Sequence, residues 1–83
     1  MFTVYILHSK ILDKYYIGFT SEEVNVRLSK HLSNHSGFTG KAKDWLIVYT
    51  ESFPIKTLAM QREKEIKKWK SKKKIEQLIG STE

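Results

Sequence analysis

Two short apolar runs at the start of the chain constrain its fold more than any other feature. The runs are Thr3–Leu7 and Tyr15–Phe19, and the stretch between them is polar, with Lys10, Asp13 and Lys14. Both are rich in β-branched and aromatic residues, which favour strands, and a short polar connection suits antiparallel neighbours. The chain is therefore predicted to begin with a β-hairpin.

A helix is predicted directly after this hairpin and is expected to end near Leu32. Val24, Leu28 and Leu32 recur at every fourth position, which places them along one helical face. Thr20 and Ser21 precede this pattern and are candidate N-cap residues, because a side-chain oxygen can accept from the free backbone N–H groups of the first turn.

The middle of the chain contains a polar, glycine-bearing loop and a third strand. The loop covers Ser33–Lys43, and the strand composition returns over Trp45–Phe53. Strict alternation would place Ile47 and Tyr49 on one face and Val48 on the other. Both faces contain apolar residues, so this strand is predicted to be buried on both sides.

Two helices are predicted at the end of the chain. Pro54 closes the third strand, and residues 56–70 keep helical spacing. Ser71 is a candidate cap for a last short helix that ends at Gly80. The fold class is therefore α+β: a three-stranded antiparallel sheet flanked by helices, in the order β-β-α-β-α-α, within one domain covering residues 1–83.

The basic residues are concentrated in one segment. The chain carries a net charge of +6, whereas residues 56–74 hold nine of its 15 Lys and Arg with only two acids, a net charge of +7. Such a surface favours a polyanionic partner, most often nucleic acid. The alternative is an ordinary solvated helix face.

Other classes of protein fit the composition less well. The chain has no cysteine, which argues against a disulfide framework or a thiolate zinc site and is typical of a reducing compartment. It shows neither a signal-peptide pattern nor an apolar run long enough to cross a bilayer. We expect a cytoplasmic protein without membrane contact.

One set of residues carries the chemistry. It consists of Tyr5, the sequence Tyr16–Gly18 (Tyr-Ile-Gly), Arg27 and His31 one helical turn apart, and Glu63 in the basic segment. Taken singly, each has a structural explanation: core tyrosines, a glycine for close packing or a bulge, an arginine and a glutamate that form an ion pair or are separate surface charges, and a surface or core histidine. Their joint occurrence in this order favours a site.

With these residues, the chain from about Phe2 to Ile79 resembles the GIY-YIG nuclease family, in particular its short stand-alone bacterial members. The resemblance implies a metal-dependent endonuclease with Tyr5, Tyr16, Arg27, His31 and Glu63 as site residues and Glu63 as the metal ligand. Two positions depart from the family pattern. The first motif lacks its glycine at Val4–Ile6, and Phe19 stands where many members carry a polar residue.

Phosphodiester hydrolysis explains why these residue types occur together. It requires an activated water, neutralised phosphate charge and an assisted leaving group. A lone Glu63 suits Mg²⁺ or Mn²⁺, which keep much of their hydration. Arg27 can bind a phosphate with two parallel hydrogen bonds. The general base remains open among Tyr5, Tyr16 and His31.

DNA is the expected substrate, with structured or damaged DNA in repair or recombination as the expected target. A protein partner could supply targeting, and the oligomeric state is open. The alternative function is a non-catalytic nucleic-acid-binding module built on residues 56–74, and a small RNA-associated protein is a third possibility. Candidate nucleic-acid contacts are Gly18, Lys41, Lys67, Lys70, Lys72, Lys73 and Lys74.

Overall fold

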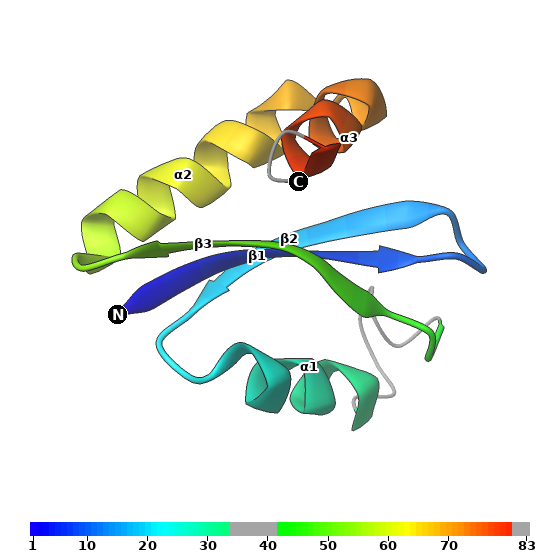
Figure 1. Cartoon of the computed structure of the whole chain (residues 1–83), viewed down its shortest axis with the longest axis horizontal. Helices are drawn as coiled ribbons and strands as arrows, with labels where there is room; N and C mark the ends of the chain where they lie inside the picture. Colours follow the sequence, from blue (N-terminus) through cyan, green and yellow to red (C-terminus); the bar gives the residue numbers. More distant parts are fainter. Residues whose placement is uncertain (34–41, 81–83) are drawn as a thin grey trace.

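A computed structural model describes residues 1–33 and 42–80 of the chain. Its elements follow in the order β1 (Phe2–Ser9), β2 (Lys14–Thr20), α1 (Val24–Ser33), β3 (Leu46–Phe53), α2 (Lys56–Trp69) and α3 (Lys72–Gly80). The α1 helix covers one face of the sheet, while α2 and α3 cover the other (Figure 1). The predicted α+β class and the predicted order of elements are confirmed.

The three strands form one antiparallel sheet in the order β2-β1-β3, with β1 at its centre. The predicted hairpin pairs β1 with β2, so that Tyr5 lies opposite Gly18 and Leu7 lies opposite Tyr16. Side chains alternate between the two faces of a strand. The central strand β1 therefore contributes to both sides of the sheet.

The alternation divides the interior into two apolar clusters. The α2-side core consists of the buried residues Val4, Ile6, Ile17, Tyr49, Ala59, Ile66 and Ile75. The α1-side core has Tyr5, Leu7 and Trp45 at its centre, and half-buried residues of α1 such as Leu28 and Leu32 pack against it. The four-residue spacing in α1 thus marks its sheet-facing side, as predicted.

The third strand differs from its prediction. Ile6 pairs with Tyr49 but Leu7 pairs with Ile47, so Val48 is an extra residue in a β-bulge. Because of this bulge, Tyr49 belongs to the α2-side core and Ile47 packs on the α1 side, although strict alternation placed both on one face. The predicted burial on both faces is met only in part: β3 packs against both cores, but most of its side chains are half-buried or exposed, and Leu46 is 66% exposed.

Local hydrogen bonds explain where the helices begin. The cap of α1 is Glu23, whose Oε2 accepts from the backbone N–H of Asn25 at 3.0 Å and of Val26 at 3.3 Å, so the predicted caps Thr20 and Ser21 were wrong. In contrast, Ser71 caps α3 as predicted and accepts from the backbone N–H of Lys74. Within the described ranges, no helix is long and apolar enough to span a membrane.

Candidate active site on the α1 face of the sheet

Four of the predicted site residues meet between the sheet and α1. Tyr5 projects from β1, Tyr16 from β2, and Arg27 and His31 from α1. The Tyr5 hydroxyl and His31 Nε2 are 2.8 Å apart in a buried hydrogen bond. The ring of Tyr16 lies edge-on to His31, with 4.9 Å between centroids, and 6.5 Å from the ring of Tyr5. These side chains form one compact polar cluster under α1.

Gly18 makes room for this cluster. A Cβ atom at Gly18 would lie 2.6 Å from the Tyr5 hydroxyl and 2.8 Å from Tyr5 Cζ, closer than real Cβ contacts allow. The Tyr5 side chain cannot easily move aside, because the residue is only 2% exposed. The glycine of the Tyr-Ile-Gly motif is therefore needed for close packing, and this packing positions the Tyr5 phenol.

Burial governs the protonation of the hydrogen-bonded pair. Burial raises the pKa of the Tyr5 phenol, and hydrogen bonding from the Arg27 guanidinium opposes that rise. Burial, followed by the positive charge of Arg27, lowers the pKa of His31 below its ordinary value. A neutral phenol and a neutral imidazole are thus favoured, with the imidazole nitrogen able to accept the phenol proton.

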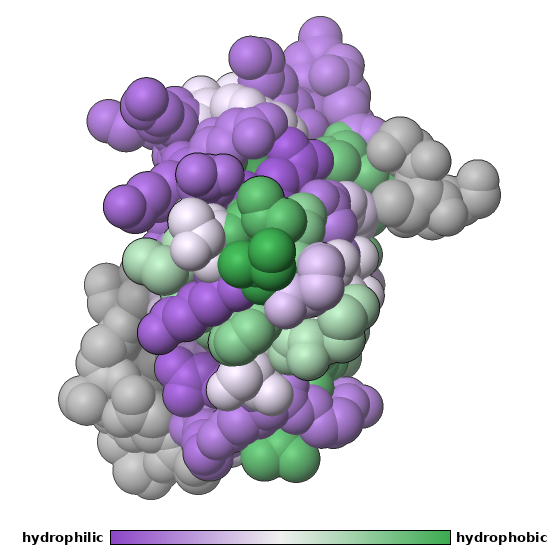
Figure 2. Space-filling model, turned by 90° about the vertical axis from the view of Figure 1, so that its left-hand side faces the viewer, coloured by the Kyte–Doolittle hydropathy of each residue, from purple (hydrophilic) through white to green (hydrophobic). Residues whose placement is uncertain are grey.

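Arg27 lies at the boundary between the buried cluster and a surface groove. Its Nε atom is buried and has no hydrogen-bond partner within the described part of the chain. The groove has a volume of about 270 Å³ and is lined by Phe2, Phe19, Thr20, Ser21, Glu22, Arg27 and Lys56. These residues come from one end of the molecule, which Figure 2 shows face-on with apolar side chains among charged ones. A phosphate in this groove would meet two cations, Arg27 and Lys56, and one acid, Glu22, whose carboxylate is paired with Lys30.

Glu63 approaches the cluster from α2. Its side chain is 17% exposed, and its Oε1 lies 3.7 Å from Lys67 Nζ. Burial is the main cause of the raised pKa of Tyr5, and the negative charge of Glu63 adds a small further rise although Glu63 lies on α2, across the sheet from α1. Arg27 and Glu63 form no ion pair with each other among the described side chains, which removes one of the two structural explanations for these residues and leaves that of separate charges.

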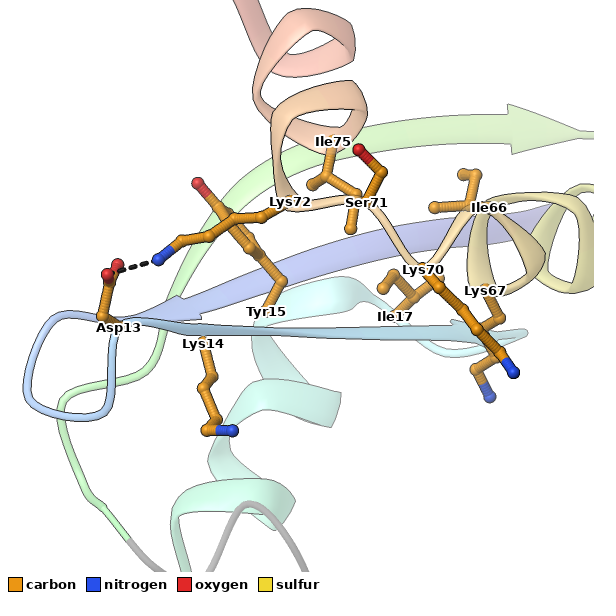
Figure 3. A pocket seen from close by; sticks show the side chains of 10 residues that line it. All are labelled: Asp13, Lys14, Tyr15, Ile17, Ile66, Lys67, Lys70, Ser71, Lys72 and Ile75. Carbon is orange, nitrogen blue, oxygen red and sulfur yellow. Dashed lines mark hydrogen bonds and ion pairs between the residues drawn. The ribbon is translucent and has the colours of Figure 1, made fainter.

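The predicted lysine contacts do not gather at this cluster. Lys67, Lys70 and Lys72 line a separate cleft at the α2–α3 junction, shown in Figure 3. Lys73 and Lys74 are exposed at the start of α3, outside this cleft. Lys41 lies outside the described residues.

The sequence analysis missed several residues that line the groove beside Arg27 and the cleft at the α2–α3 junction. Lys56 lines the groove beside Arg27, while Lys14 and Tyr15 line the cleft at the α2–α3 junction. Strand alternation could have indicated Tyr15, because it places this residue on the face opposite Tyr16 and toward the basic helices. Nothing in the sequence pattern pairs Lys56 with Arg27.

Comparisons with known proteins identify the family of the chain. The family model described as the GIY-YIG catalytic domain matches residues 1–76. A search of curated proteins finds no match. Among solved structures, the chain is similar to a UPF0213 protein from Bacillus halodurans, determined by solution NMR, with 34% sequence identity and a TM-score of 0.58. That similarity covers 96% of this chain and 84% of the other. The chain belongs to the GIY-YIG catalytic-domain family, which is a family of nucleases.

Proposed function

We propose that the protein is a metal-dependent endonuclease that cleaves DNA. The observation that carries this proposal is the buried hydrogen bond between Tyr5 and His31 beside the Arg27 guanidinium. A phenol coupled to a neutral imidazole can take a proton from water, and an adjacent guanidinium can hold the phosphate. Structured or damaged DNA in repair or recombination is the target class we favour.

Tyr5 and His31 are proposed to act together as the general base. As the oxygen of a water molecule attacks phosphorus, its proton passes to the Tyr5 oxygen while the phenol proton passes to His31 Nε2. The phosphorus bond to the leaving oxygen then breaks. The raised pKa of Tyr5 makes a free phenolate costly, so this relay suits the site better than a tyrosinate waiting for substrate. Tyr16, packed edge-on to His31, would hold the imidazole in position.

Arg27 and Lys56 are proposed to bind the phosphate in the groove between them. The planar guanidinium can form two parallel hydrogen bonds to phosphate oxygens, and the ammonium adds a second positive charge. Because Arg27 Nε lacks a hydrogen-bond partner among the described residues, a phosphate contact would also stabilise that buried donor.

Glu63 is proposed to hold one Mg²⁺ or Mn²⁺. No group of three or more His, Cys, Asp or Glu side chains gathers in the described ranges, so the protein itself would supply few of the metal ligands. This fits a cation that keeps its waters and binds substrate oxygens, and Lys67 near the carboxylate would keep metal binding weak without substrate. When bound, the ion would stabilise the charge that develops on the phosphate and leaving oxygen.

Cleavage assays with a matched pair of variants test the proposal. Supercoiled and branched DNA would be incubated with Mg²⁺, Mn²⁺ or EDTA, using the wild type, Glu63→Gln and Glu65→Gln. Glu65 lies on the same helix and is more exposed, with a side-chain exposure of 56%, so its substitution removes the same charge outside the site. We expect metal-dependent cleavage that Glu63→Gln abolishes and Glu65→Gln retains.

Two results would contradict parts of the proposal. Cleavage that persists in Glu63→Gln would leave a nuclease but exclude Glu63 as its essential metal ligand. Salt-sensitive DNA binding without cleavage by any of the three proteins would favour the non-catalytic binding module, for which the basic cleft at the α2–α3 junction is the supporting observation.

A further inference from the structure

The cleft at the α2–α3 junction lies on the face of the sheet opposite the tyrosine cluster. It has a volume of about 480 Å³ and opens between β2, the end of α2 and the start of α3 (Figure 3). Its floor is apolar and consists of Tyr15, Ile17, Ile66 and Ile75. A volume of this size lies within the range of small-ligand sites.

Lysines surround this apolar floor. Lys14 comes from β2, Lys67 and Lys70 from the end of α2, and Lys72 from the first turn of α3. Asp13 is the one acid among the cleft residues, and its carboxylate pairs with Lys72 and with His8. The first turn of α3 carries no acid that would offset its lysines. Positive charge at a helix N-terminus is unfavourable until an anion neutralises it.

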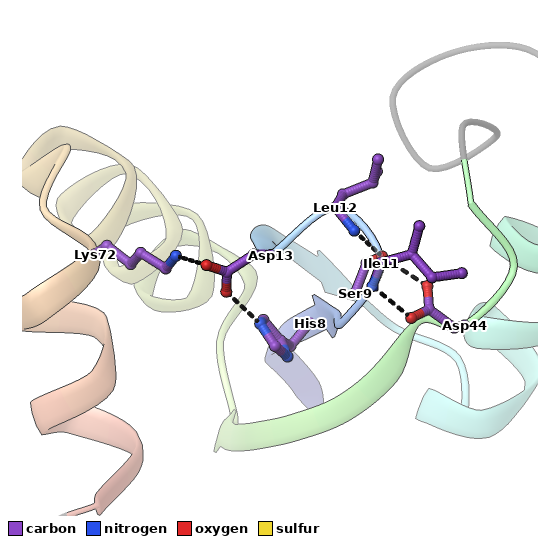
Figure 4. Close-up of polar contacts among 7 residues, drawn as sticks. All are labelled: His8, Ser9, Ile11, Leu12, Asp13, Asp44 and Lys72. Atoms are coloured by element: carbon purple, nitrogen blue, oxygen red, sulfur yellow. Dashed lines mark hydrogen bonds and ion pairs between the residues drawn. The ribbon is translucent and has the colours of Figure 1, made fainter.

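Hydrogen bonds hold the wall of the cleft in place. The β1–β2 turn carries Asp13 and is anchored from the opposite side by Asp44 (Figure 4). Asp44 accepts from Ser9 Oγ at 2.6 Å and from the Ile11 backbone N–H at 2.9 Å. At the other end, Lys70 adopts a left-handed conformation with φ 48°, which ends α2 and turns the chain into α3. The cleft is therefore largely formed before any ligand binds.

An apolar floor with a cationic rim matches the two halves of a nucleotide. A base can lie against Tyr15 and the isoleucines, while its phosphates meet the lysines. A base inside a duplex is stacked and paired, and cannot enter such a cleft without leaving the helix. Duplex backbone contacts alone would not require the apolar floor.

The cleft is also close to the proposed metal ligand along α2. Lys67 lines the cleft, and its Nζ lies 3.7 Å from Glu63 Oε1, one helical turn earlier. We propose that this cleft binds one unpaired nucleotide of the nucleic acid that the active site cleaves, so that the preferred substrate contains a single-stranded segment. This inference rests on the proposed nuclease function.

Binding measured in EDTA, where metal-dependent cleavage is suppressed, tests the cleft directly. The probes are a fluorescent oligothymidylate and an abasic strand of the same length, which has the same phosphates but no bases. We expect the wild type to bind the oligothymidylate about tenfold more tightly, because stacking contributes roughly 1–3 kcal/mol per base. Equal binding of both strands would overturn the proposal.

Two matched double variants locate the site. Lys14→Asn with Lys70→Asn removes two lysines from the cleft, and asparagine tolerates the left-handed conformation at position 70. Lys10→Asn with Lys43→Asn removes two exposed lysines that do not line it. We expect the cleft variant to bind oligothymidylate about tenfold more weakly than the control variant. Equal weakening would indicate diffuse charge and would overturn the proposal.

Asp13→Asn tests the cleft with a change that should strengthen oligothymidylate binding instead of weakening it. Asparagine is isosteric and tolerates the left-handed φ of 50° at this position, while the change frees Lys72 and removes the only acid of the rim. We expect tighter binding of the oligothymidylate, and weaker or unchanged binding would count against a phosphate at Lys72. If the wild type cleaves DNA but the cleft variants do not change binding as expected, only the proposal for the cleft is overturned. If the cleft variants change binding as expected but no protein cleaves DNA, the nuclease function is overturned and the cleft remains a binding site.

Discussion

The two faces of the sheet are built from alternate residues of the same strands but differ in what they bury. The α1 face buries polar groups, with the phenol of Tyr5 hydrogen-bonded to His31 under Arg27. The core of the α2 face is apolar apart from the Tyr49 hydroxyl, which donates to Glu51, and the partly buried Arg62, which pairs with the same carboxylate; its lysines surround an open cleft. Buried polar groups are costly unless partnered, so the coupled phenol and imidazole make the α1 face the favoured place for the proposed chemistry.

Glu63 links the two faces. It belongs to α2, yet its charge contributes to the raised pKa of Tyr5 on the α1 side. The comparison therefore predicts that substitutions on the α1 face change the rate more than the stability, and that substitutions in the α2-side core do the reverse.

The largest expected effect is that of Tyr5→Phe on the cleavage rate. The change removes one oxygen and keeps the ring, so we expect about 10²–10⁴-fold slower cleavage, the usual contribution of a general base. Single-turnover rates with excess enzyme would measure it, and circular dichroism would show that the fold is retained. A rate within a few-fold of the wild type would remove Tyr5 from the proposed relay.

Gly18→Ala should affect both the cleavage rate and the stability. The new Cβ would meet the Tyr5 hydroxyl at 2.6 Å, so we expect a loss of about 1–3 kcal/mol in the free energy of unfolding together with slower cleavage. Gly80→Ala is the matched control, because nothing lies within 4 Å of a Cβ there, and it should be neutral or slightly stabilising. Urea unfolding of both variants would show whether the close packing at Gly18 is essential.

Ile6→Val probes the opposite face. Ile6 is fully buried in the α2-side core and lines neither the groove nor the cleft, and removing one methylene group should lower the free energy of unfolding by about 0.5–1.5 kcal/mol. The cleavage rate per folded molecule should stay unchanged at a temperature where the variant is folded. A large change in rate would show that the α2-side core also positions the reacting groups.

The smallest effect is a pH dependence of stability from His31. Its folded-state pKa lies below the ordinary 6.5, so the unfolded chain binds more protons as the pH falls below that value. Stability should therefore decrease from about pH 6.5 downward and level off once the pH is below the folded-state pKa. Urea unfolding across this range should show a shallower decrease for His31→Gln. An identical slope in both proteins would assign the dependence to other groups.

The sequence by itself determined the element order, the hairpin that brings Tyr5 and Tyr16 together, and the helical pair Arg27 and His31. These features depend on local periodicity, which a chain of 83 residues displays directly. Family resemblance joined the two pairs into one site and added Glu63, which lies on a helix packed against another part of the sheet.

Only the tertiary structure decided the details that depend on register and on contacts between distant segments. The bulge at Val48 reversed the expected faces of β3, because one extra residue shifts every side chain after it. The steric need for Gly18 appeared only when β1 placed Tyr5 opposite it. The cleft at the α2–α3 junction likewise forms only because β2 packs against the end of α2 and the start of α3. Charge and periodicity are properties of the sequence, whereas a cleft depends on which residues, distant in the sequence, come together to line it.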